Sequence, residues 1–267
     1  MHPHRNAIAN DKPGLLPANR SLERGIEPLR AFRQGSELLG NGELAERTGL
    51  SKATVSRLTQ TLVGSGMLQL DTGRRAYRLA PAVLSLGHAM RSGSRVLSLA
   101  APLMRALAES RRINVGLAAP DRDEMVYLES IRYSRKLSLR SVVSGQRVPM
   151  ELTSLGRAYL AAAPETRRAL LLRIFRQRRA AQWNHLAAEI ERAIAAVASR
   201  GYCVAAWQPE VVALATPITA EDGAIYVLNL SLSTSESMQS VARELAPTLL
   251  ALAADIQHAM QVESRHG

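Results

Sequence analysis

Apolar residues near the front of the chain recur at intervals of three or four, which is the spacing of one helix face. Ser21 has a side chain that favours helix N-caps, and it precedes a first such run made of Leu22, Ile26, Leu29 and Phe32. We therefore expect a helix from Ser21 to about Phe32, followed by a break at Gly40–Gly42.

Residues 43–48 and 51–63 predict two short helices joined at Gly49, where glycine adopts a positive φ at little cost. Two helices that cross steeply need a small residue where they touch, and Ala45 provides one. The apolar residues that would pack between them are Leu44, Leu50, Val55 and Leu58. Ser51 would cap the second helix, so the pattern from Asn41 to Gln60 predicts a helix-turn-helix.

A hairpin pattern follows these helices, with Met67–Leu70 and Arg75–Leu79 on either side of a turn at Asp71-Thr72-Gly73. Pro81 would close the unit. The hairpin contains three basic residues that would form a wing suited to the DNA backbone or the minor groove, namely Arg74, Arg75 and Arg78. Together these elements predict a winged helix-turn-helix over residues 20–81.

The outward face of the helix that begins after Ser51 carries side chains that suit DNA. If Val55, Leu58 and Leu62 face inward, helical geometry turns five residues outward: Lys52, Ala53, Ser56, Arg57 and Gln60. Arginine can bind guanine, and glutamine can bind adenine, through paired hydrogen bonds. Ser51 and Thr54 are better placed for phosphates. The alternative is an ordinary helical hairpin with a solvated polar face.

Residues 82–110 are mostly helical in pattern, with breaks near Gly93 and Pro102, and would link the wing to a second domain. Beyond them, predicted strands cover residues 114–118, 125–131, 137–143, 202–206, 211–215 and 224–233. Predicted helices cover residues 155–163, 165–175, 186–199 and 237–260. Strands set beside helices in this way predict an α+β domain over residues 111–267.

Charge is distributed unevenly along this basic chain, whose formal net charge is +11. Residues 20–80 have ten basic and six acidic residues, residues 81–150 have eleven and five, and residues 151–267 have eleven of each. A positive excess confined to the front suggests a polyanionic partner there, and double-stranded DNA fits the helix-turn-helix. The alternative is a charge that serves only solubility. Residues 1–19 mix proline, asparagine and charge without periodicity and are predicted to be a mobile tail.

Several kinds of site find no support in the sequence. Cys203 is the single cysteine, which excludes an intrachain disulfide and a cysteine-rich zinc site. His88 and His185 are isolated, so no metal and no cofactor are expected. With no apolar run of membrane-spanning length and no signal-peptide pattern, we expect a soluble cytoplasmic protein and no membrane partner. Arg176–Arg179 could be a second nucleic-acid patch, although a solvated helix face is the commoner case.

Several segments of the sequence resemble the IclR family of bacterial transcriptional regulators. They are SLERGIEPLRAF (21–32), ELAERTGLSKATVSRLTQTLVGSGML (43–68), RRAYRLAPAVLSLG (74–87), VYLESI (126–131), TSLGRAYLAA (153–162), RGY (200–202) and LNLSLS (228–233). The resemblance implies a winged helix-turn-helix, a linker helix and a GAF-like effector domain that binds a small organic acid. It also implies homodimers, often paired as dimers of dimers, on palindromic operators.

The resemblance further implies where an effector would bind. The matching positions lie before and at the start of a helix, after the RGY match and along two late strands: Met150, Ser154, Leu155, Gly156, Ala206, Ala213, Ser231 and Ser233. Relatives that bind small keto acids have an acidic residue and a cysteine where this chain has Ala205 or Ala206 and Ala213. The site is therefore expected to be less polar and to bind a larger effector, such as an aromatic acid.

Two other classes of function stay open at this point. The second domain could serve only to oligomerise a DNA-binding protein, or it could be a degenerate enzyme. The chain lacks G-x-S-x-G, P-loop and G-x-G-x-x-G motifs and shows no evident nucleophile–base pair, which argues against an enzyme. The alternation that places Ser231 and Ser233 on one strand face favours a pocket wall.

Overall fold

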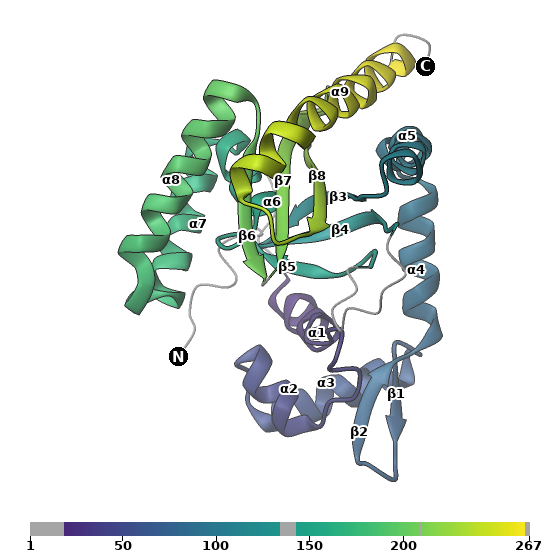
Figure 1. The fold of residues 1–267 in the computed structure, drawn as a ribbon. Coiled ribbons are helices and arrows are strands. Elements are labelled where there is room, and N and C mark those ends of the chain that lie inside the picture. The colour runs from purple at the N-terminus through teal and green to yellow at the C-terminus, as the bar shows by residue number, and fades with distance from the viewer. Residues whose placement is uncertain (1–18, 134–142, 209, 265–267) are drawn as a thin grey trace. The chain divides into compact units, whose positions relative to one another are not determined.

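Residues 19–133, 143–208 and 210–264 are described in this computed structural model, and they divide into two units between Gly93 and Ser94 (Figure 1). The predicted tail, apart from Asn19, lies outside the described residues, and so does the predicted strand at 137–143 apart from Val143. No helix within the described ranges is long and apolar enough to cross a bilayer. The two units match the predicted order, with a winged helix-turn-helix before an α+β domain.

The described part of the first unit consists of α1 (Arg20–Arg30), α2 (Asn41–Thr48), α3 (Lys52–Gly64), β1 (Leu68–Asp71), β2 (Ala76–Leu79) and α4 (Pro81–Ser92). The two strands pair antiparallel, as the turn at Asp71-Thr72-Gly73 predicts. A small core joins the helices to the hairpin through Phe32, Leu39, Leu44, Val55, Leu68 and Tyr77. This core fixes α3 against α2.

Two helices of this unit begin earlier than the sequence pattern predicts. Ser21 does not cap α1, because the side chain of Asn19 accepts hydrogen bonds from the amides of Ser21 and Leu22. The helix α2 begins at Asn41 because the Glu43 carboxylate turns back and accepts from the Gly40 amide at 2.9 Å. In both cases a polar side chain outside the apolar pattern sets the start of the helix.

The second unit is built around one antiparallel sheet with the strand order β5-β4-β3-β8-β7-β6. Its strands are β3 (Asn114–Asp121), β4 (Glu124–Ile131), β5 (Arg147–Pro149), β6 (Cys203–Gln208), β7 (Val211–Thr219) and β8 (Ile225–Ser233). Its helices are α5 (Arg95–Arg111), α6 (Ser154–Ala162), α7 (Glu165–Arg178), α8 (Trp183–Arg200) and α9 (Met238–Ser264). The α+β fold class is therefore confirmed.

The two faces of the sheet have separate cores. On one face, α5 and α9 pack over residues such as Leu117, Leu214 and Leu228. On the other face, α6, α7 and α8 pack over residues such as Ala215 and Val227. Alternation along each strand therefore assigns each side chain to one of the two layers.

Two features of this unit differ from the sequence prediction. Pro102 does not break a helix but lies within α5, because buried residues such as Leu97 and Met104 hold the helix against the sheet on both sides of the proline. The short edge strand β5 is absent from the prediction. Three residues are too few to show an alternating pattern, and pairing with β4 defines this strand.

Candidate DNA interface and effector site

The helix α3 presents the residues predicted to read DNA. Lys52, Ala53, Arg57 and Gln60 are exposed, and Ser56 is half-buried. The opposite face is fixed by Val55, which is fully buried in the core of the unit. A helix with this division can lie in the major groove, with long polar side chains toward the base edges.

The turn into α3 has the predicted geometry. Gly49 has a φ of 71°, and its amide donates to the carbonyl of Ala45 at 2.9 Å. Ser51 is the N-cap of α3, with its hydroxyl 3.2 Å from the amide of Thr54 and 2.9 Å from the Thr54 hydroxyl. Both hydroxyls therefore lie at the positive end of the helix, where phosphates bind.

A buried threonine that sequence reasoning missed holds α3 against α2. Thr59 is fully buried, and its hydroxyl lies 3.0 Å from the Val55 carbonyl and 3.3 Å from Asn41 Oδ1. The apolar pattern assigned the inner face to Leu58, which is only half-buried. Thr59 lies four residues after Val55, so the helical spacing itself was a signal that the polar side chain obscured.

The wing separates the three predicted arginines into two groups. Arg74 and Arg75 lie in the turn and are exposed, and Arg75 has a positive φ of 52°. Arg78 lies on β2 opposite Gln69 and forms an ion pair with Asp71 at 2.5 Å. The pKa of Asp71 is lowered, first by a hydrogen bond from the Arg74 amide and then by Arg78. The turn therefore presents two arginines, while Arg78 has an acidic neighbour.

The N-terminal end of α6 packs closely against the backbone of the segment that precedes it. Thr153 caps the helix by accepting from the Gly156 amide at 3.2 Å. A Cβ on Gly156 would overlap the backbone of Met150, so only glycine lets that segment cross the first turn of α6. Ser154, Leu155 and Gly156 are all buried.

Strand pairing places Ala213 and Ser231, which were predicted to line the effector site, on the α6 side of the sheet. Ser231 pairs with Ala213, and Cys203, one strand further, donates from its sulfur to the Ser154 carbonyl at 3.4 Å. Ala205 is the residue that pairs with Ala213, whereas Ala206 is exposed beside a bulge. Ala206 therefore lies outside the row that contains Ala213 and Ser231, and its role as a lining residue stays a prediction. Burial raises the pKa of the Cys203 thiol to about 12, which fits a structural role.

Side chains on one face of β8 become more exposed toward the end of the strand. Asn229 is buried, Ser231 is half-buried and Ser233 is exposed, and all three lie on the same strand face. The start of α6 lies over the buried part of this face, because Ser154 contacts Cys203 in the row that contains Asn229. The open row beyond it is formed by Ala205, Ala213, Ser231 and Asn114.

A buried ionic cluster lies beside this site, and only its arginines from the Arg176–Arg179 run were singled out by the sequence. Glu151 is fully buried, and its Oε1 lies 3.1 Å from Arg179 Nε and 3.5 Å from Arg178 Nη1. Arg157 on α6 donates to the Glu151 carbonyl at 3.1 Å and pairs with Glu189 on α8 at 2.7 Å. The segment before α6 is therefore tied to α7 and to α8.

This cluster bears on two expectations. Arg178 and Arg179 turn inward onto Glu151, and Arg178 also pairs with Asp123, so the Arg176–Arg179 run is not simply a solvated face. Buried polar groups also lie on this side of the sheet, with Glu151 in the segment before α6 and Asn229 on β8. Glu151 and Asn229 are not among the positions that the family resemblance assigns to the effector site.

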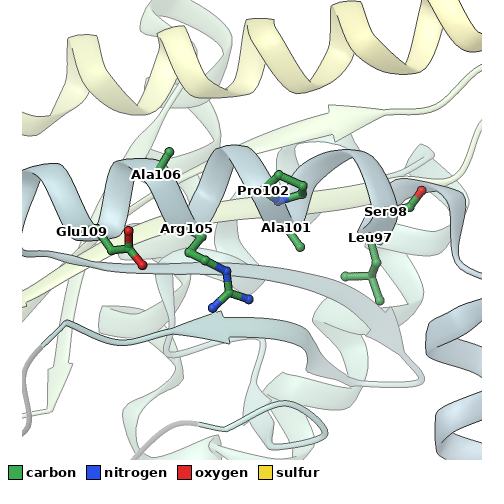
Figure 2. Close-up of a pocket in the computed structure, with 7 residues that line it drawn as sticks. All are labelled: Leu97, Ser98, Ala101, Pro102, Arg105, Ala106 and Glu109. Atoms are coloured by element: carbon green, nitrogen blue, oxygen red, sulfur yellow. The ribbon is translucent and has the colours of Figure 1, made fainter.

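An open groove runs along α5, and Figure 2 shows its lining side chains on that helix. They are Leu97, Ser98, Ala101, Pro102, Arg105, Ala106 and Glu109. Because every lining residue comes from α5, the groove is a surface feature distinct from the start of α6.

Comparison with known proteins agrees with this architecture. The IclR helix-turn-helix domain matches residues 21–72, and the bacterial transcriptional regulator IclR C-terminal domain matches residues 88–258. The HTH-type transcriptional regulator TsaQ1/TsaQ2 of Comamonas testosteroni is 38% identical over 188 residues, covering 69% of this chain and 66% of that protein. The Pca regulon regulatory protein of Pseudomonas putida is 30% identical over 244 residues, covering 89% and 83%.

A solved structure extends the likeness to three dimensions. The IclR family transcriptional regulator from Brucella abortus matches with a TM-score of 0.79 at 35% sequence identity, covering 90% of this chain and 91% of that chain. These relatives are transcriptional regulators and not enzymes, which confirms the expectation against an enzyme. The chain belongs to the IclR family of DNA-binding bacterial transcriptional regulators.

Proposed function

We propose that this chain is a cytoplasmic, effector-controlled regulator that binds a palindromic operator as a homodimer or as a dimer of dimers. The observation that carries the DNA part is the division of α3, which exposes Lys52, Arg57 and Gln60 while Val55 and Thr59 anchor the opposite face. Arg74 and Arg75 in the wing turn add phosphate or minor-groove contacts beside the reading helix.

The helix α4 supports the dimer. Val83, Leu86, Gly87 and Met90 share one helix face, and α4 contains no buried residue. Leu86 is 59% exposed and Met90 is 53% exposed. An apolar stripe of this kind is typical of a protein–protein contact, and Gly87 would let a second copy of the helix approach closely. Two copies related by a two-fold axis would present two reading helices to a palindrome.

The start of α6 supports an anionic effector. Its backbone amides and the positive end of its dipole favour a carboxylate. Ala205 and Ala213 would provide an apolar floor beside this end, with Ser231 next to them on the adjacent strand. A flat ring fits such a floor better than a two- or three-carbon chain does. We infer that the effector is an organic acid, with an aromatic acid as the first candidate.

The test has two stages. The operator is first selected from random DNA with the full chain, and we expect an inverted repeat with half-sites about one helical turn apart. Calorimetry then compares benzoate-type acids with glyoxylate and pyruvate. Tight binding of the small keto acids alone would contradict the aromatic assignment. A chain that binds the operator but no metabolite would instead favour a second domain that only oligomerises.

A further inference from the structure

Two buried carboxamides on the α6 side of the sheet each have an oxygen without a hydrogen-bond partner among the described residues. These atoms are Asn114 Oδ1 on β3 and Asn229 Oδ1 on β8. Asn229 is 3% exposed, and Asn114 is half-buried. Buried polar atoms in folded proteins are almost always paired, so two unpaired oxygens on neighbouring strands indicate that a ligand supplies the donors.

The side chain of Asn229 lies next to Tyr127. Burial raises the pKa of Tyr127 to about 12, and a side-chain hydrogen bond from Asn229 partly opposes that rise. Oδ1 is the atom of Asn229 that is buried without a hydrogen-bond partner, so it is the acceptor that a ligand could use. Gly116 makes room for this arrangement, because a Cβ there would overlap Asn229 Oδ1 and the Tyr127 ring.

Strand register sets the distance between these oxygens and the start of α6. Asn229 pairs with Ala215, and Ala215 pairs with Cys203, which contacts the Ser154 carbonyl. Asn229 is therefore two strand spacings, about 10 Å, from the strand beneath the start of α6. Asn114 lies one strand further away on β3. A carboxylate bound at α6 needs a ring or a longer chain behind it before another group can reach either asparagine.

We propose that Asn114 and Asn229 form a hydroxyl-binding subsite that selects acids with a hydroxyl group remote from the carboxylate. This subsite rests on the proposed effector site at α6, and it narrows the ligand class. The two carboxamide oxygens share the single proton of the hydroxyl in a three-centre hydrogen bond, which an unsubstituted acid cannot make. Hydroxylated aromatic acids and long hydroxy acids share this chemistry.

Calorimetry with matched pairs of acids tests the subsite in the full chain. One pair is benzoate with 4-hydroxybenzoate, and the other is hexanoate with 6-hydroxyhexanoate. We expect the wild type to bind one hydroxylated acid about tenfold more tightly than its unsubstituted partner. The pair that shows this ratio distinguishes a ring from a chain. In Asn114→Ala and Asn229→Ala the ratio should fall to about two or less, with little change for the unsubstituted acid.

Thr219→Ala is the matched control, because Thr219 is exposed at the far end of β7 and should leave the ratio unchanged. Thermal melting checks that each variant is folded, and the half-buried Asn114 carries the test if Asn229→Ala fails to fold. A ratio that persists in Asn114→Ala, or a wild type indifferent to the hydroxyl, would overturn the subsite and leave the effector site intact. A chain that binds none of the four acids would count against both.

Discussion

The helix-turn-helix of residues 41–60, here called the reading head, and the effector site are assembled in different ways. The reading head lies within one stretch of about twenty residues, and each of its exposed side chains follows from the helical spacing of its buried ones. The effector site draws on α6, β3, β6, β7 and β8, which are up to about a hundred residues apart in the chain. Local spacing therefore predicts the first site residue by residue, whereas the second depends on strand register and on contacts between distant segments.

The difference also concerns tolerance to change. In the reading head, Gly42 in α2 has nothing within 4 Å of where a Cβ would lie. At the effector site, two glycines have no such room: Gly156 is against the Met150 backbone, and Gly116 is against Asn229 and Tyr127. Exposed DNA-reading residues can change with little effect on the fold, while effector-site residues carry structural and binding roles together.

A glycine-to-alanine substitution in each of the two regions should give the largest difference in stability. Gly156→Ala forces the new Cβ into the backbone of Met150, so we expect a loss of about 3 kcal/mol of stability and of effector binding. Gly42→Ala in α2 has nothing within 4 Å of its Cβ and should be neutral or slightly stabilising. Thermal melting measures both. Equal effects of the two variants would show that Met150 moves aside without cost.

Arg57→Ala should test the reading face. We expect a loss of about 2 kcal/mol in operator binding and relaxed base choice at one position, because Arg57 is exposed on α3 where a base edge can be reached. Arg74→Ala in the wing turn should weaken binding similarly for all sequences, as the loss of a phosphate contact does. Footprinting and binding to single-base operator variants distinguish the two. An unchanged base preference in Arg57→Ala would remove Arg57 from the reading face.

Much of the fold could be predicted from the sequence because most elements have their own apolar period. The caps Asn19 and Glu43 and the buried Thr59 were missed because polar side chains interrupt that period. At the effector site, Asn114, Asn229 and Glu151 gave no local signal at all. Their burial depends on strands and helices that only the fold brings together, so no spacing rule applied to one segment could have found them.

The ionic cluster before α6 also depends on contacts between distant segments, and breaking it should cause a smaller loss of stability. Arg179→Ala leaves the buried Glu151 with Arg178 as its remaining ion-pair partner among the described residues. The expected loss is about 1–2 kcal/mol, less than for a fully buried pair because the Arg179 side chain is 36% exposed. Arg176→Ala, an exposed arginine of the same run, should change stability by no more than about 0.5 kcal/mol. Equal losses would mean that Glu151 does not rely on Arg179.

The smallest expected effect concerns the pKa of Asp71 in the wing. The pKa of Asp71 is lowered in the folded chain, so its interactions stabilise the hairpin at a pH above the ordinary aspartate pKa and are lost as the pH falls through the lowered value. NMR titration of the carboxyl group should show Arg78→Ala raising this pKa only part of the way, because the larger contribution is the hydrogen bond from the Arg74 amide. A full return to the ordinary value would assign the shift to Arg78 instead. Either result depends only on residues within one hairpin, as expected for a region whose structure is set locally.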